Sequence, residues 1–334
     1  MNKFNSSKKP LVWFSALLLS AAVAGCGGQD PILGGGAAIT GGAAGVSNLP
    51  GINTAMLGTA APFGMAATAG VTNTNTAPIT SINGDVVLVP VGFASCNAVA
   101  VDNAGGFGLC GSASLPSAFA PILGGTSKVY SAYYDPLAAV SGVKADMNTA
   151  YLKLTPPAGP PAAGSLGGAI NLPAGTTLGA AKGSAMVLGD NLFFPGVYQS
   201  ITSIMITGDL TLDAQGNSNA VFVFQSSSTI GTAAGGPTPA DRTRILLING
   251  AKASNVWWQA SSDATLGLYS EFQGNILAAR DITMKTGATS CGRLFAGAWV
   301  GVTGGTGKFV FDSNVVSVPG QPFAPPAGYS TTCQ

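Results

Sequence analysis

The side chains that could carry chemistry in this chain are few, and their types exclude most catalytic machinery. The 334 residues contain no His, which removes the Ser-His and Cys-His systems that activate a nucleophile. Asp209 and Asp213 lie four residues apart on an expected strand and therefore face one side, at a separation where carboxylate pairs can cleave glycosidic bonds. Hydrogen bonding in turns or between strands explains both residues more simply. We therefore expect no catalytic residue and no enzyme.

A more informative pattern is a threonine followed by a large aliphatic residue. It occurs in Thr211-Leu212, Thr229-Ile230, Thr265-Leu266 and Thr283-Met284, whose Thr positions differ by whole multiples of 18 residues. Such a period predicts a solenoid in which each coil contains three short strands and three corners. Stacked coils would bury the aliphatic residue and turn the threonine outwards. The sequence therefore predicts a ladder of threonines on one flat wall.

Composition supports an all-β domain with one covering helix. The chain has 48 Gly and 21 Pro, and only 8% of its residues are charged, as expected for short strands separated by turns. Apolar residues step by three or four positions across residues 136–155, which predicts a helix against one wall, with Asp135 as its N-cap. Residues 92–130 have no period and are expected to form a cap or insertion. A further loop insertion is expected from Thr232 to Thr243.

The amino terminus has the pattern of a secretory leader. Three lysines precede an apolar run that ends in Val23-Ala24-Gly25-Cys26, which resembles a bacterial lipobox. We expect residues 1–25 to be a signal peptide, Cys26 to be lipid-modified and residues 26–54 to be a flexible Gly-rich tether. Gly27 rather than Asp follows the cysteine, which is typical of delivery to the outer membrane of a Gram-negative cell. The folded domain is expected over 55–318, with a tail at 319–334.

Cysteine usage fits an exported protein. If Cys26 is acylated, four cysteines remain, and an even number in this compartment indicates two disulfides. Three pairings are possible; we favour Cys96 with Cys110 and Cys291 with Cys333. Without His or a Cys-x-x-Cys spacing, neither a metal site nor a cofactor is expected. The 14 basic and 13 acidic side chains also give no electrostatic footprint for nucleic acid.

Several runs together match the pattern of one known family. The most distinctive are Thr207–Gly216 (TGDLTLDAQG) and Asn219–Gln225 (NAVFVFQ), supported by Asn255–Gln259 and Phe272–Ala278. In these runs the chain resembles the microbial ice-binding family, over roughly residues 55 to 318. The resemblance implies a discontinuous right-handed β-solenoid of triangular section, with a long α-helix packed along one side. It also implies adsorption to ice through one flat face, with ice and ordered water as the partner of a monomer.

An ice-adsorbing face requires an ordered array of methyl and hydroxyl groups. Threonine supplies both on a side chain whose Cβ branching restricts its rotation. Glu271, Lys285 and Arg293 would disrupt such an array if they lay on the face. The expected ice-binding residues are Thr211, Thr229, Thr265, Thr283, Thr289 and Thr303, with Thr72, Thr74 and Thr76 from the first coils.

A second hypothesis keeps the same fold but assigns it no ice activity. It is a cell-surface adhesion or carbohydrate-contact module, in which aromatic rings stack on a ligand. The candidate rings are Trp257, Trp258, Trp299 and Tyr269.

Overall fold

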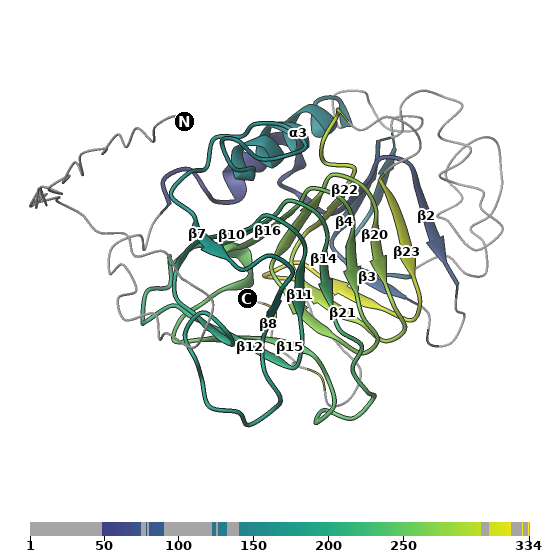
Figure 1. The fold of residues 1–334 in the computed structure, drawn as a ribbon. Helices are drawn as coiled ribbons and strands as arrows, with labels where there is room; N and C mark the ends of the chain where they lie inside the picture. Colours follow the sequence, from purple (N-terminus) through teal and green to yellow (C-terminus); the bar gives the residue numbers. More distant parts are fainter. Residues whose placement is uncertain are drawn as a thin grey trace, which may run out of the picture. The chain divides into compact units, whose positions relative to one another are not determined.

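The computed structural model describes residues 49–74, 78, 80–89, 122–124, 126–131, 140–301, 307–321, 329 and 333. Their strands form three parallel sheets, because each coil contributes one strand to each wall (Figure 1). This arrangement confirms the predicted β-solenoid. Residues expected to form the leader, most of the tether and the Cys96–Cys110 pair lie outside the described residues.

The nine-stranded sheet is the wall that the helix covers. Its order is β6 (Val129–Ser131), β4 (Asp85–Leu88), β1 (Phe63–Ala67), β22 (Leu294–Ala296), β19 (Asn275–Ala278), β16 (Val256–Ala260), β13 (Phe222–Ser226), β10 (Gly196–Ser200) and β7 (Ile170–Leu172).

The seven-stranded sheet forms the second wall. Its order is β2 (Gly70–Asn73), β23 (Lys308–Phe311), β20 (Ile282–Met284), β17 (Ala264–Leu266), β14 (Ile230–Thr232), β11 (Ile204–Ile206) and β8 (Thr176–Leu178).

The eight-stranded sheet forms the third wall. Its order is β5 (Ile122–Leu123), β3 (Ser81–Asn83), β24 (Val315–Ser317), β21 (Thr289–Cys291), β18 (Glu271–Gln273), β15 (Arg244–Ile248), β12 (Asp209–Asp213) and β9 (Leu192–Phe193).

The stacking register confirms the 18-residue period for the coils that contain β16, β19 and β22. Ala260 pairs with Ala278, which pairs with Ala296. Inward side chains from all three sheets form one apolar core, and its aromatic residues stack along the solenoid axis. The Phe224 and Trp258 rings lie 4.2 Å apart and nearly parallel. Like residues in register therefore give each coil the same interior as its neighbour.

The chain does not fill the solenoid in sequence order. β1 pairs with β4 on one side and with β22 on the other, so the first coil is held between an early and a late coil. The chain then passes through the helix and re-enters the stack at β7, the opposite edge of the nine-stranded sheet. The predicted discontinuous arrangement is thus present.

The helix α3 spans Val143–Leu154, and a 3-10 helix, η1, spans Thr54–Ala60. The buried apolar face of α3, which includes Met147 and Tyr151, packs on the outer face of the nine-stranded sheet with Trp257 and Phe295. The helix was predicted over 136–155; its end agrees, whereas Asp135 and Pro136 lie outside the described residues. Gly142, with a φ of 92°, precedes the first residue of α3 instead of a side-chain cap.

Two predicted boundaries are wrong in detail. Ile52 is buried in the cluster beneath α3, so the folded domain begins within the stretch expected to be tether. β5 lies inside the expected 92–130 insertion and β6 overlaps its end, yet they pair with β3 and β4 as ordinary solenoid strands. Short strands next to an insertion carry too few residues for a period to be visible in the sequence.

Candidate functional site

The three walls differ in what covers them, and this difference identifies the candidate site. The nine-stranded wall is buried beneath α3 and η1, because outward residues such as Val223, Trp257 and Leu277 belong to the cluster that the helix closes. Figure 1 shows α3 lying along this wall. A ligand surface cannot use it.

The eight-stranded wall carries ion pairs and the C-terminal segment. Arg244 binds Asp209 through two hydrogen bonds of 2.8 and 2.6 Å, and hydrogen bonding to this carboxylate raises the pKa of Arg244. Arg242 and Glu271 form a buried pair at 3.1 Å. Because this wall carries charged side chains and is partly covered by C-terminal residues, it is unsuited to a regular array of neutral groups.

The C-terminal segment is fixed to the same wall at two points. The Tyr329 ring lies 3.4 Å from the Arg242 guanidinium carbon, and its hydroxyl donates to the Gly287 carbonyl. Cys333 forms a disulfide with Cys291 of β21, as the sequence predicted. The charged pair of Arg242 and Glu271 therefore lies under an aromatic lid.

The seven-stranded wall presents a row of neutral residues, one from each strand. Each of these residues has buried neighbours on both sides and so faces away from the core, but Gly231 is itself buried and has no side chain there. Register places these residues side by side in the order Thr72, Val310, Thr283, Thr265, Gly231, Met205 and Thr177. We call this set the central row.

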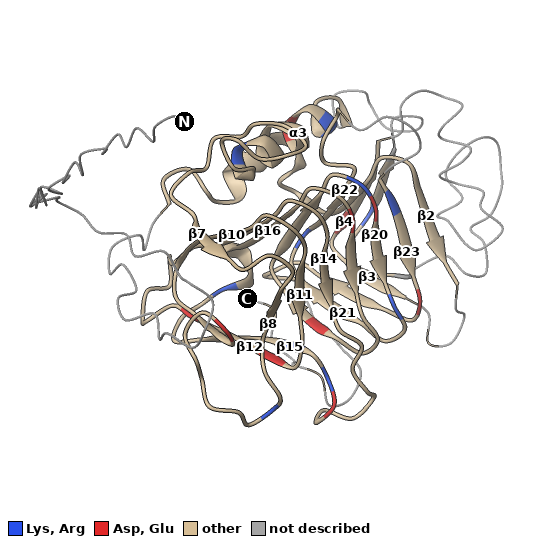
Figure 2. Cartoon of the chain, in the orientation of Figure 1, with Lys and Arg blue, Asp and Glu red and all other residues tan. Residues whose placement is uncertain are grey.

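Charged side chains lie at the ends of these strands rather than in the central row. Asp263 and Asp281 come directly before β17 and β20, and Lys285 directly follows β20. Lys308, at the start of β23, is exposed. Figure 2 shows the middle of this sheet without charge and the coloured positions near its strand ends. The central row is therefore neutral but has a charged margin.

The acidic residues of this margin are tied into the corner. Asp281 accepts hydrogen bonds from the backbone amides of Gly307 and Lys308, and Asp263 pairs with Arg280 at 3.6 Å. Their oxygen atoms hold corner backbone in place.

The predicted threonines fall on more than one wall. Thr265 and Thr283 are direct register neighbours in the central row, and Thr72 lies in the same row. Thr229 is exposed two residues before Gly231, and exposed Thr74 follows β2. Thr76 and Thr303 lie outside the described residues.

Thr211 and Thr289 correct the predicted ladder. Both lie on the eight-stranded wall, at 6% and 4% exposure. The prediction of a single ladder through Thr211, Thr229, Thr265 and Thr283 is wrong, because the earlier coils are longer than 18 residues: Ile204 pairs with Ile230, and Ile230 pairs with Ala264. Counting by 18 therefore loses the register, so that Thr211 falls on a different wall and Thr265 pairs with Gly231 rather than with Thr229.

Sequence reasoning missed four members of the central row. Three of them, Met205, Gly231 and Val310, are not threonines. The fourth, Thr177, is followed by Leu178, but this pair does not fit the 18-residue spacing of the others. Alternation could have indicated Val310, which lies between Phe309 and Phe311, and Met205, which lies between Ile204 and Ile206. Gly231 gives no outward signal at all.

The alternative chemistries find no support among the described side chains. Asp209 is neutralised by Arg244, and Asp213 accepts hydrogen bonds from the Gln215 amide and the Asn249 side chain. Trp257 and Trp258 are fully buried, so neither can stack on an external ligand. Trp299 and Tyr269 are half-buried, and Trp299 packs against the cluster beneath α3. In the part of the chain described, no group of three His, Cys, Asp or Glu residues could hold a metal ion.

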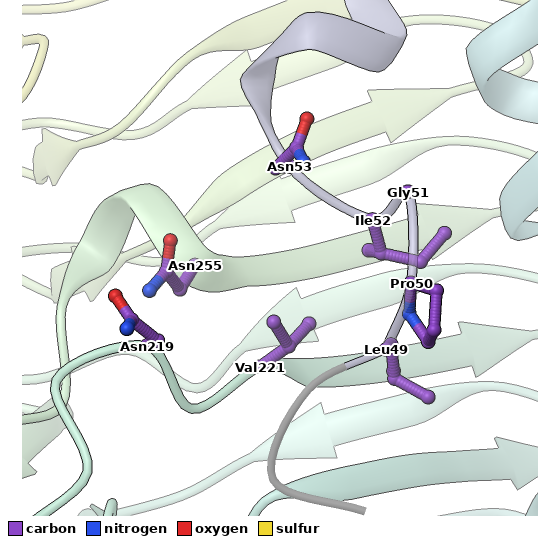
Figure 3. Close-up of a pocket in the computed structure, with 8 residues that line it drawn as sticks. All are labelled: Leu49, Pro50, Gly51, Ile52, Asn53, Asn219, Val221 and Asn255. Carbon is purple, nitrogen blue, oxygen red and sulfur yellow. The ribbon is translucent and has the colours of Figure 1, made fainter.

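A hollow of about 350 Å³ lies beside the entry of the chain into the domain. Its lining consists of Leu49, Pro50, Gly51, Ile52, Asn53, Asn219, Val221 and Asn255 (Figure 3). The lining contains no aromatic ring and no ionisable group, so it offers neither a stacking platform nor a catalytic residue. Across the described residues, no helix has the length and apolar character needed to cross a membrane.

Comparison with known proteins agrees with this geometry. A family model described as ice-binding-like matches residues 65–304, which is more than half of the chain. The chain belongs to the ice-binding-like family. It is 42% identical over 131 residues to an ice-binding protein of Nostoc sp. (strain HG1), a match covering 39% of this chain and 43% of that protein. The chain therefore spans less than half the length of this relative.

Two longer matches cover most of the domain. An ice-binding protein of Leucosporidium sp. (strain AY30) is 30% identical over 242 residues, covering 72% of this chain and 77% of that protein. The crystal structure of an ice-binding protein from the Antarctic ascomycete Antarctomyces psychrotrophicus superposes with a TM-score of 0.51 at 28% identity, over 78% of this chain and 96% of that one. The second match shows that this solved structure shares the fold of the chain.

Proposed function

We propose that this protein adsorbs to ice through the central row of the seven-stranded wall, without catalysis. The observation that carries the proposal is the direct pairing of Thr265 with Thr283 in a neutral row, on a wall that is covered neither by α3 nor by the described C-terminal residues Tyr329 and Cys333. The proteins similar to this chain are named for binding ice.

The physical basis is a stiff, repeated surface rather than any single strong bond. Parallel strands about 4.8 Å apart carry outward side chains in register, so the methyl and hydroxyl groups repeat with that spacing. Each contact through water is weak and costs about 0–2 kcal/mol of water ordering, so adsorption needs many aligned contacts. A wall backed by a close-packed core does not have to reorganise on binding, which keeps that cost low.

Replacing Thr283 with Tyr tests the proposal. A ring projecting from the middle of the row would hold ice away from the neighbouring strands, so Thr283→Tyr should abolish thermal hysteresis and recrystallisation inhibition. The matched control is Thr149→Tyr, which places the same ring on the exposed side of α3 and should leave activity unchanged. Circular dichroism and the melting temperature establish that both variants are folded. Full activity of folded Thr283→Tyr would assign ice binding to another surface.

We further propose that the protein is exported and held at the cell surface, in a Gram-negative outer membrane, by lipid on Cys26. The Val23-Ala24-Gly25-Cys26 sequence and the Gly-rich stretch that follows it support this proposal. A tether of this kind would let a monomeric domain meet ice outside the cell, either to restrain recrystallisation or to hold the cell to ice. Cys26→Ser should move the protein from the detergent phase to the aqueous phase in a phase-partition assay. Wild-type protein in the aqueous phase would contradict the anchor while leaving ice binding untested.

A further inference from the structure

We propose that the pair of Met205 and Gly231 confines effective ice adsorption to one half of the central row, because neither residue supplies a branched hydroxyl side chain there. This inference rests on the proposed function and concerns the same wall. It identifies Met205 and Gly231 as the pair that sets the extent of the adsorbing surface.

The two residues interrupt the row at adjacent strands. Met205 of β11 pairs with Gly231 of β14, and Gly231 pairs with Thr265 of β17. On the far side of Met205 the row resumes with Thr177 of β8. Thr177 is thus separated from Thr265 and Thr283 by two strands that lack a branched hydroxyl side chain.

The Met205 side chain occupies the space above Gly231. Its methyl carbon lies 3.3 Å, and its sulfur 3.5 Å, from the position that a Cβ on Gly231 would take. The side chain remains 41% exposed, so it also projects to solvent. Methionine has three rotatable bonds and no hydroxyl group, whereas a threonine here would be held by its branched Cβ. A flexible thioether therefore stands where the array should be most regular.

The interrupted half has the less charged margin. Ser203 and Thr229 stand at the positions that Asp263 and Asp281 take in the next two strands, and Thr207 and Ala233 stand at the other strand ends. Strands β8, β11 and β14 thus offer a neutral margin as well as a neutral centre. Only the Met205 and Gly231 pair prevents this half from extending the threonine array.

The test is a double-mutant cycle that restores the row. Gly231 is not among the positions with a positive φ. A Cβ there would meet the flexible Met205 side chain at 3.3 and 3.5 Å and the Thr265 carbonyl oxygen at 3.4 Å, the last an ordinary van der Waals contact. Met205→Thr with Gly231→Thr should therefore fold and give about a twofold or greater increase in thermal hysteresis, because aligned contacts act together. All variants carry Cys26→Ser in the full chain, so that lipid does not affect the ice assay.

The single variants make the test specific. Gly231→Thr alone pushes Met205 outwards and should lower activity, while Met205→Thr alone should change it little, so the pair should show positive coupling. Met186→Thr removes a methionine that is 61% exposed in the loop between β8 and β9 and should have no effect. A folded double variant with unchanged or lower hysteresis would overturn the inference, even where Thr283→Tyr abolishes activity. Loss of the proposed function itself would appear instead as activity that survives Thr283→Tyr.

Discussion

At the scale of single residues, the wall on which a residue lies decides whether it belongs to the proposed ice-binding surface more than its residue type does. Thr211 and Thr265 begin similar Thr-Leu pairs, yet one is buried on the eight-stranded wall and the other lies in the central row. Glu271, which could have disrupted an ice face, is paired with Arg242 on a different wall. Arg293 also lies away from the central row, where its Nε donates to the Ala61 carbonyl. Lys285 alone of the three lies beside the row, after the end of β20.

Lys144 gives a prediction at this scale. Its ammonium group donates to the Gly297 carbonyl at 2.6 Å, and burial lowers its pKa from 10.5 to about 8. Between these two pH values the unfolded chain keeps a proton that the folded chain has released, so this group makes the free energy of unfolding rise with pH. Below pH 8 both states are protonated, and the full cost of burying the charge is present.

Lys144→Met should therefore flatten the pH dependence between pH 8 and 10, and should raise the free energy of unfolding at pH 7 by on the order of 1 kcal/mol. Urea denaturation at several pH values measures both effects. Loss of the hydrogen bond to Gly297 offsets part of the gain, so the slope is the decisive quantity. A slope that persists in the variant would assign the pH dependence to another group.

At the scale of elements, α3 stabilises the solenoid from a wall that the proposed site does not use. Met147 and Leu154 are fully buried against the nine-stranded sheet. Tyr151 accepts a buried hydrogen bond of 2.8 Å from Gln259 of β16, and burial raises the pKa of its phenol to about 12. The helix can therefore be weakened without altering the central row.

Met147→Ala should lower the free energy of unfolding by about 2–5 kcal/mol, because it removes a large buried side chain and leaves a cavity. Thr149→Ala, an exposed substitution on the same helix, should change stability by no more than about 0.5 kcal/mol. Near 0 °C, where both variants are folded, thermal hysteresis should equal that of the parent protein. A loss of hysteresis in folded Met147→Ala would show that the two walls are coupled.

The elements also show which parts of the fold and of the candidate site the sequence could predict. The 18-residue period and the apolar stripe across residues 136–155 predicted the coil stack and the covering helix, because both patterns are local and periodic. Assignment of outward threonines to walls failed at Thr211 because the coils differ in length, so a fixed count of 18 residues does not keep a position on one wall. It failed at Thr289 because this residue lies on β21, the strand that follows β20 along the chain. The Gly231 gap also could not be predicted, because a missing side chain has meaning only beside its neighbours.

At the scale of the whole domain, a disulfide near the C-terminus fastens the end of the chain to the solenoid. The Cys291–Cys333 disulfide joins β21 to the C-terminal segment across 42 residues. Closing a loop of this length in the unfolded chain corresponds to about 4 kcal/mol in the chain-entropy model. Cys333→Ser should lower the midpoint of thermal unfolding accordingly, with ice activity retained in the cold. An unchanged midpoint would show that Tyr329 and its neighbours hold the segment without the covalent link.

The position of β1 between β4 and β22 has a consequence for biosynthesis. The strand of Met65 gains its second partner only when Leu294 is available, and Leu294 is translated more than two hundred residues later. A nascent chain therefore cannot complete its first coil during synthesis, and any premature stop leaves that strand with an unpaired edge. Such long-range pairing slows folding, so the first coil closes only after the last coils have been translated.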